Sequence, residues 1–240
     1  MVNPVNPVPS ATAPCAAVGL VVLDMAGTTV SDGGLVERAF ADAARRLGED
    51  PAPLLPHVRA TMGESKISVF RHLFAGDEAK ARRATTAFEE SYAGLLAAGA
   101  VTPVPGAADT VRGLREQGRT VVLTTGFGRA TQEALLDALG WRDLADLALC
   151  PADAGGRGRP FPDLVLTALL RTGAVDDVAR VAVAGDTAYD MLSGVRAGAG
   201  LVAGVLTGAH DRGRLVSHGA THVLGSVAEL PAAIAGAEAR

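Results

Sequence analysis

Residues 19–30 read GLVVLDMAGTTV, an unbroken apolar run that stops abruptly at Asp24 and is followed by a Gly/Thr turn. This pattern is typical of a buried parallel strand. From Pro103 onward, helical patterns alternate with short apolar runs, as in a parallel sheet covered by helices. The sequence therefore predicts an α/β fold whose parallel sheet has five or six strands, with helices on both faces. The later strands are expected at residues 120–123, 147–150, 181–184, 200–205 and 221–224.

A long segment of different character lies between the first strand and Pro103. From Leu35 to Ala100 the apolar residues recur every three or four positions, and no convincing strand interrupts them. We expect an insert of about four helices here. The sequence thus predicts a disordered N-terminal tail over residues 1–18, a core made of residues 19–34 and 103–240, and a helical insert over residues 35–102.

The composition narrows the class of protein. Of the 240 residues, 48% are hydrophobic, which is enough to bury a sizeable core. The apolar runs fall far short of the ~20 residues that span a bilayer. The N-terminus lacks the basic start of a signal peptide, so we expect a cytoplasmic protein without a membrane partner. The net charge of −4 argues against nucleic acid as a partner, and two cysteines suffice for neither a disulfide framework nor a metal cluster.

Polar residues directly follow several predicted strands, where open parallel sheets bind their ligands. The first strand ends in DMAGTTV from Asp24, the next core strand in TTG at 124–126, and a later one in GDTAYD at 185–190. The sequence RGRPFP, residues 157–162, precedes a helix. Carboxylates suit a divalent cation, hydroxyl and N–H donors suit a phosphoryl group, and an Arg balances its charge. Together these groups predict a site for phosphoryl transfer.

Each of these signals also has a purely structural interpretation. Asp24 could cap a helix, Thr124 and Thr125 are common strand residues, and GDT with Asp190 could form an ordinary turn and a capped helix. Because four such signals occur in order on alternating strands, we favour a functional site.

The use of lysine provides an independent signal. Of the 22 basic residues only Lys66 and Lys80 are lysines. Arginine does not lose its proton in proteins, so it cannot replace an amine nucleophile. Lys80 lies in the charged helix DEAKARRA, where we expect it to be solvated. Lys66 is therefore a candidate for a chemical role.

These motifs resemble those of the haloacid dehalogenase superfamily, whose members use an Asp nucleophile after the first strand of a Rossmann-like core. The resemblance covers nearly the whole chain after residue 18, and the helical insert matches the superfamily's cap domain. The usual DxDGT motif has Ala26 in place of its second Asp, and Arg159 stands where most phosphatases have Lys. Both departures are similar to the phosphonoacetaldehyde hydrolase branch. So is MGESK, residues 62–66, in which Lys66 falls on the Schiff-base position.

The resemblance implies a reaction. Asp24 would attack phosphorus to give an acyl phosphate, while an imine between Lys66 and an aldehyde would accept the electrons of the breaking C–P bond. With that sink no acid is needed to protonate a departing oxygen, so Ala26 is acceptable in place of Asp. Mg²⁺ would be held by the Asp24 carboxylate, the Ala26 backbone carbonyl and Asp186, supported by Asp190. The implied substrate-binding residues are Ala26, Met62, Thr125, Gly126 and Arg159.

Three positions depart from that branch: its cap His is Val69, its Cys is Gly34, and its Tyr after TTG is Phe127. His72, one helical turn beyond Val69, could compensate, although a structural role is the more common one for such a residue. The sequence is therefore interpreted as a phosphonatase-like hydrolase of a small phosphonate or phosphate. The resemblance further implies a homodimer formed through the cap.

Three alternatives remain at this point. A phosphatase acting on a small phosphomonoester would use Lys66 as a plain cation. A dehalogenase with the same nucleophile would have no use for the metal site that Asp186 implies. A binding protein on a decayed enzyme scaffold would not be expected to keep Asp24, Thr125, Arg159 and Asp186 together.

Overall fold

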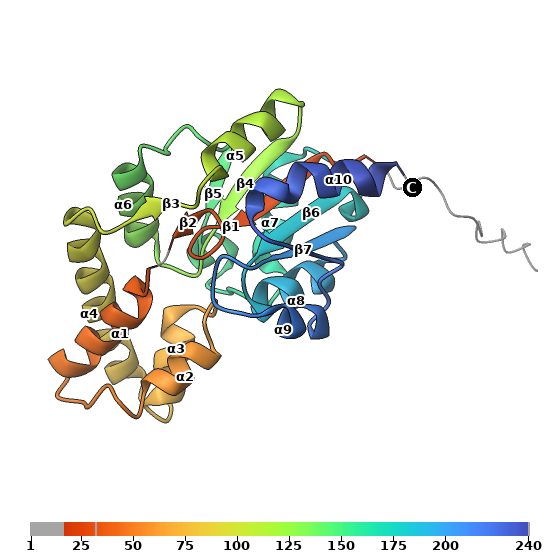
Figure 1. Cartoon of the computed structure of the whole chain (residues 1–240). Helices are drawn as coiled ribbons and strands as arrows, with labels where there is room; N and C mark the ends of the chain where they lie inside the picture. The colour runs from red at the N-terminus through yellow and green to blue at the C-terminus, as the bar shows by residue number, and fades with distance from the viewer. Residues whose placement is uncertain (1–16, 32, 240) are drawn as a thin grey trace, which may run out of the picture.

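The computed structural model describes residues 17–31 and 33–239, so most of the expected tail, residues 1–16, lies outside the described part. Six parallel strands form one sheet in the order β5-β4-β1-β6-β7-β8, which confirms the expected α/β class (Figure 1). The strands begin within one residue of their predicted starts. They are β1 (Leu20–Asp24), β4 (Thr120–Thr124), β5 (Leu147–Leu149), β6 (Val181–Gly185), β7 (Leu201–Val205) and β8 (His222–Leu224).

Strand β1 lies inside the sheet, and all five of its residues are buried there. Its neighbours on either side are β4 and β6. Asp24 is in register with Thr124, and Leu23 with Ala184, so the carboxyl ends of the three strands meet at one edge. Residues that follow these strands are thereby brought together, as expected for a parallel sheet.

Alternate side chains of β1 enter two hydrophobic cores. Val21 and Leu23 pack in the core that also holds residues of α5 and α10, whereas Leu20 and Val22 pack with residues of α7. Helices therefore cover both faces of the sheet, as the alternating pattern predicted (Figure 1). The helices of this part of the chain are α5 (Ala107–Glu116), α6 (Arg129–Leu139), α7 (Asp163–Thr172), α8 (Ala188–Ala197), α9 (Arg212–Ser217) and α10 (Leu230–Glu238).

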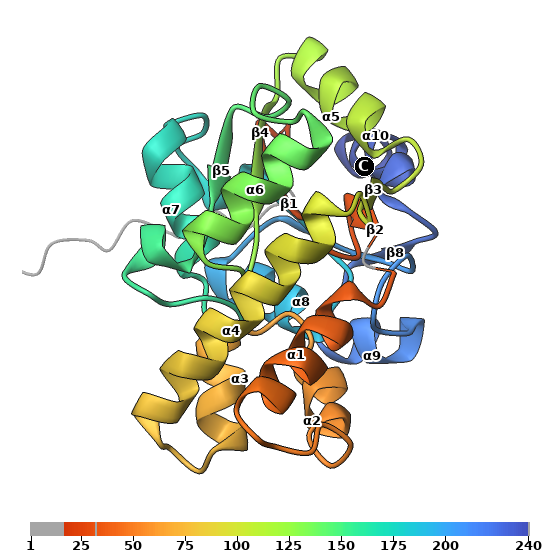
Figure 2. The same cartoon turned by 90° about the vertical axis from the view of Figure 1, so that its left-hand side faces the viewer.

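Four helices occupy the predicted insert and lie together at one end of the molecule (Figures 1 and 2). Phe40 joins three of them, because its ring centroid lies 4.8 Å from those of both Phe70 and Phe88. The division of the chain into a core and a cap with the stated boundaries stays a prediction. The four helices are α1 (Leu35–Arg46), α2 (Leu55–Ala60), α3 (Lys66–Leu73) and α4 (Glu78–Ala97).

Two features of the insert were not expected. The two-residue strands β2 (Val30–Ser31) and β3 (Thr102–Pro103) pair antiparallel where the chain enters and leaves the helical segment. The expectation that Lys80 is solvated is wrong in part, because its ammonium pairs with Glu49 at 2.5 Å and lies 4.6 Å from the Phe74 ring.

Among the described residues, no helix has the length and apolar character needed to cross a membrane.

Candidate active site

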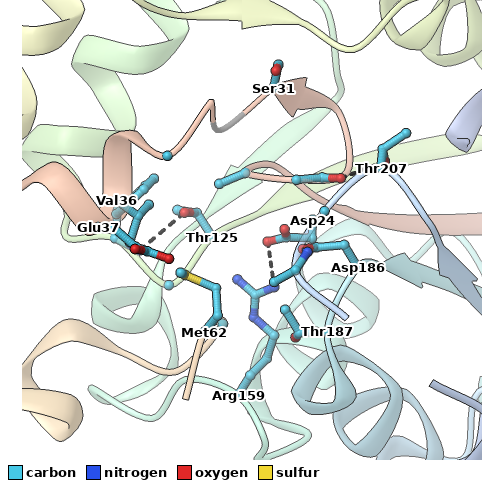
Figure 3. A pocket seen from close by; sticks show the side chains of 18 of the residues that line it. Asp24, Ser31, Val36, Glu37, Met62, Thr125, Arg159, Asp186, Thr187 and Thr207 are labelled. Carbon is cyan, nitrogen blue, oxygen red and sulfur yellow. Dashed lines mark hydrogen bonds and ion pairs between the residues drawn. The ribbon is translucent and has the colours of Figure 1, made fainter. Parts of the chain in front are cut away.

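A cavity of about 300 Å³ opens where the carboxyl ends of β1, β4 and β6 face the helical segment (Figure 3). Eight of the nine predicted site residues line it, and the ninth, Asp190, lies behind Arg159. The structure thus brings together groups that are up to 162 residues apart in the chain. The eight lining residues are Asp24, Ala26, Met62, Lys66, Thr125, Gly126, Arg159 and Asp186.

Three buried carboxylates converge at the sheet end of this cavity. Asp24, Asp186 and Asp190 each offer an oxygen, and these oxygens lie within 4.8 Å of one another. Burial raises the pKa of Asp24 to about 6, with Arg159 opposing the rise and Asp190 adding to it. Burial, together with the charges of Asp24 and Asp190, raises the pKa of Asp186 well above its usual value. Such a concentration of buried negative charge fits a divalent cation with oxygen ligands.

Arg159 is the cation that the described chain places among these carboxylates. Its Nη1 lies 2.5 Å from Asp24 Oδ1 and also pairs with Asp190 Oδ1. Asp190 in turn accepts hydrogen bonds from the backbone N–H of Thr187 at 3.1 Å and from its hydroxyl at 2.5 Å, at the start of α8. Asp190 is therefore engaged with Arg159 and the helix cap, a placement that suits the supporting role predicted for it.

Two glycines let the backbone approach Asp186 closely. A Cβ atom added to Gly27, whose φ is 90°, would lie 2.4 Å from Asp186 Oδ2, and one added to Gly208 would lie 1.9 Å from it. The Ala209 N–H donates to the same oxygen at 2.7 Å, and the Thr28 hydroxyl donates to Oδ1 at 3.3 Å. The carboxylate is thereby held in one orientation toward the cavity.

Lys66 is the first residue of α3 and is buried, with 8% of its surface exposed. Its Nζ lies 5.1 Å from the centroid of the Phe127 ring and 5.8 Å from those of Phe40 and Phe88. Phe127 follows the TTG motif, while Phe40 and Phe88 come from α1 and α4. An aromatic wall contributed by both parts of the chain therefore surrounds the amine that lines the cavity with Asp24.

The loop just before Lys66 packs directly on the residues that follow the strands. A Cβ atom added to Gly63, whose φ is 97°, would lie 2.5 Å from Thr187 Oγ1, and one added to Gly126 would lie 3.1 Å from the carbonyl oxygen of Glu64. Arg214 of α9 also donates to the carbonyl of Ala60 at 2.9 Å. The helical segment is thus docked on the sheet edge and covers the cavity.

The structure places the departures from the phosphonoacetaldehyde hydrolase pattern in different environments. Val69 is buried in the hydrophobic core, whereas Gly34 lines the cavity. His72 is exposed and stacks on His57 with centroids 4.0 Å apart. It is not among the cavity residues, so it does not take the place of the lost histidine in this arrangement.

Several cavity residues were missed by sequence reasoning. Thr207, Gly208 and Ala209 follow β7, and the rule that ligands lie beyond strand ends could have indicated them. Glu37 lines the cavity from α1, where the helical pattern gave no reason to single it out.

The comparison with known families decides the classification. The sequence model of a hydrolase family, described as haloacid dehalogenase-like hydrolase, matches residues 18–198. The chain belongs to the haloacid dehalogenase-like hydrolases. Their Asp nucleophile, phosphoryl-binding and acidic motifs are those on which the sequence resemblance rested. The protein is therefore a hydrolase of this superfamily.

The names of individual relatives indicate two different activities for those proteins. The chain is 32% identical over 202 residues to the "Probable phosphatase IndB" of Dickeya dadantii, covering 82% of this chain and 84% of that protein. It is 29% identical over 255 residues to the "Phosphonoacetaldehyde hydrolase" of Parabacteroides distasonis, covering 89% and 94%. Among solved structures, a phosphonoacetaldehyde hydrolase-like protein of Oleispira antarctica superposes with a TM-score of 0.84 at 24% identity and 98% coverage of both chains, a likeness of fold alone.

Proposed function

We propose that this hydrolase cleaves the C–P bond of phosphonoacetaldehyde or a similar small aldehyde phosphonate. The observation that carries the proposal is that a buried Lys66 and Asp24 line the same cavity of about 300 Å³. Ala26 supports it, since this side chain has no proton to give to a departing alkoxide but a C–P cleavage through an imine needs none.

In the proposed reaction the neutral Lys66 amine condenses with the aldehyde and releases water, and the resulting imine takes up a proton from solvent. An Asp24 carboxylate oxygen then attacks phosphorus. The electron pair of the C–P bond moves into the imine, which becomes an enamine, and Asp24 becomes an acyl phosphate. Water hydrolyses the acyl phosphate to inorganic phosphate. Protonation of the enamine and hydrolysis of the resulting imine release acetaldehyde and restore Lys66.

The other cavity residues have positions that suit supporting roles. Arg159 contacts Asp24 and would balance the charge of the phosphoryl group. The Thr125 hydroxyl and the Gly126 N–H lie at the carboxyl end of β4, where they would hold phosphoryl oxygens. Met62 and the docked loop around Gly63 would exclude water during imine formation.

The carboxylates of Asp24 and Asp186, with the backbone carbonyl of Ala26, would hold Mg²⁺. Bound there, the ion supplies positive charge that offsets the repulsion between the carboxylates and the phosphoryl oxygens. Asp190 would act through Arg159 and the α8 cap.

Hydrolysis of a small phosphomonoester is the second candidate. Its support is the relative named a probable phosphatase, which is 32% identical. In that reaction Lys66 would bind the substrate as a cation, and the absence of an acid at Ala26 would leave the departing alkoxide to be protonated by other means.

Trapping with borohydride separates the two candidates. The Mg²⁺-loaded protein is incubated with phosphonoacetaldehyde and borohydride and then analysed by intact mass and peptide mapping, while phosphate release is measured without borohydride. We expect a reduced adduct on Lys66, phosphate release in the untrapped reaction, and the loss of both in Lys66→Arg. No adduct and no phosphate release, with activity on a panel of phosphomonoesters, would favour the phosphatase.

A further inference from the structure

A further carboxylate lines the cavity from the helical segment and lies apart from Asp24 (Figure 3). Glu37, in the first turn of α1, lines the cavity together with Val36 (Figure 3). Among the described residues that line it, the charged side chains contributed by the helical segment are Glu37 and Lys66. A ligand whose phosphoryl group lies against Asp24 would therefore extend toward one acid and one amine.

The orientation of Glu37 is fixed from outside the cavity. Its Oε1 accepts from Arg59 Nε at 2.9 Å and its Oε2 accepts from Arg59 Nη2 at 2.8 Å, a two-point contact between α1 and α2. The Glu37 side chain is 30% exposed and that of Arg59 is 59% exposed. The guanidinium lies on the solvent side of this pair, whereas Glu37 borders the cavity. Arg59 therefore holds the acid in place and offsets part of its negative charge.

We propose that Glu37 determines specificity by selecting against substrates that carry a carboxylate at the end remote from phosphorus. The inference rests on the proposed function and narrows its substrate class. In a cavity of about 300 Å³ a second carboxylate cannot move far from Glu37, so it meets a like charge at short range. An aldehyde or a hydroxyl group is uncharged and meets no such repulsion, and a hydroxyl can donate a hydrogen bond to the acid.

Two stable phosphonates test this selection without any bond cleavage. In 2-hydroxyethylphosphonate and phosphonoacetate, equal carbon chains end in a hydroxyl and in a carboxylate. Neither has an aldehyde, so neither can form an imine with Lys66. Affinities for the Mg²⁺-loaded protein are measured by calorimetry for the wild type and for Glu37→Gln, which keeps the size and an acceptor oxygen but removes the charge.

The matched control is Glu90→Gln. Glu90 also pairs with an Arg of the helical segment, Arg46, at 2.9 Å, but it is not among the residues that line the cavity. We expect Glu37→Gln to shift the affinity ratio at least about fivefold toward phosphonoacetate, as removal of one nearby like charge implies. Glu90→Gln should leave the ratio unchanged.

The same comparison is made for P–O cleavage with a second pair of compounds, 2-hydroxyethyl phosphate and 2-phosphoglycolate. The ratio of their kcat/KM values is measured in the same variants. A ratio that stays within about twofold of wild type in Glu37→Gln for both pairs, or shifts equally in Glu90→Gln, would overturn the inference. A shifted ratio in a protein that fails to release phosphate from phosphonoacetaldehyde would leave the role of Glu37 intact and reject C–P cleavage. The two conclusions can thus fail separately.

Discussion

A single guanidinium offsets part of the negative charge around the proposed nucleophile. Arg159 Nη1 contacts both Asp24 and Asp190, and all three side chains are buried. An arginine at this position keeps its charge despite burial, which a lysine in the same place would lose more readily. The remaining buried carboxylate, Asp186, whose pKa burial raises well above its usual value, suits a further cation at this site.

A substitution at Ala26 tests whether an acid at this position would promote cleavage of a P–O bond. In Ala26→Asp a carboxyl group would enter the cavity two residues after Asp24, where it could protonate a departing alkoxide. General acids contribute about 10²–10⁴-fold, so we expect hydrolysis of 2-hydroxyethyl phosphate to rise at least about tenfold. Steady-state phosphate release measures it.

The control for this change is Ala26→Asn, which has nearly the same size but no proton of suitable acidity. It should leave phosphomonoester hydrolysis at the wild-type level. An equal rise in both variants, or none in Ala26→Asp while its fold and metal binding are retained, would contradict the interpretation of Ala26.

At the level of elements, the loop before α3 connects the helical segment to the sheet edge. Gly63 lies against Thr187, and the Gly126 backbone lies against the carbonyl of Glu64. Both contacts place Lys66 and Met62 over residues that follow β4 and β6. The position of the amine relative to Asp24 therefore depends on a close backbone approach that only a residue without a side chain permits.

Gly63→Ala tests this dependence. The added methyl would lie 2.5 Å from the Thr187 hydroxyl, so the loop must move away and carry Lys66 with it. A misplacement of about 1 Å can cost up to 10²-fold in rate, and we expect kcat/KM to fall at least about tenfold. Gly48→Ala is the control, because Gly48 has a similar φ of 79° but no heavy atom within 4 Å of the added Cβ.

Thermal unfolding of both variants separates backbone strain from loss of docking. The free energy of unfolding of each variant should fall by about 1 kcal/mol, because alanine is strained at a positive φ. Only Gly63→Ala should also lose activity. Equal activity losses in the two variants would show that general destabilisation, not the Gly63 contact, is responsible.

The sequence predicted the elements whose pattern is long enough to be read. The strand at 20–24 was found because its apolar run ends in a polar turn, and the helices of the insert because their periodicity persists over many residues. The pair β2 and β3 was not found, since two residues show no period. The contact of Lys80 with Glu49 was also missed, because it joins α4 to a turn whose position depends on tertiary packing.

The part of the site that follows the strands could be predicted from the sequence, and the part that depends on tertiary packing could not. Residues after β1, β4 and β6 carry distinctive side chains, and the sheet necessarily gathers them at one edge. Residues 207–209 follow β7 and could have been indicated by the same rule, whereas Glu37 lines the cavity through the orientation of α1, which no local pattern records. The low number of lysines singled out Lys66, and the family resemblance supplied its role. Its distance along the chain from Asp24 does not show by itself that the two residues share a cavity.

On the scale of the whole molecule, the sheet edge and the helical segment contribute different kinds of residue to the cavity. The sheet edge supplies Asp24, Asp186, Arg159 and the residues proposed to bind the phosphoryl group, while the helical segment supplies Lys66, Met62 and Glu37. The docked arrangement also joins their hydrophobic cores, because Phe127 packs on Tyr92 with ring centroids 4.7 Å apart. A ligand or ion that binds at the edge is therefore expected to stabilise the molecule as a unit.

Mg²⁺ should accordingly raise the melting temperature of the wild type. A ligand at 100 times its Kd contributes about 2.7 kcal/mol, which for a chain of this size corresponds to roughly 5–10 °C. Asp186→Asn should lose most of this rise, because the buried carboxylate it removes is one of three converging oxygen donors. Asp109→Asn, at an exposed carboxylate paired with Arg112, should keep it.

The metal-free state gives this test a second readout. Burial raises the pKa of Asp186, so the ionised carboxylate is costly in the folded protein near neutral pH, where the unfolded chain ionises it freely. Asp186→Asn removes that cost and should melt at or above the wild type in EDTA, although it melts below the wild type in Mg²⁺. A merely structural carboxylate would instead lower the melting temperature in both conditions when replaced. Asp186 is assigned to the cation site if Asp186→Asn melts at or above the wild type in EDTA and below the wild type in Mg²⁺. A lower melting temperature than the wild type in both conditions would exclude Asp186 from that site.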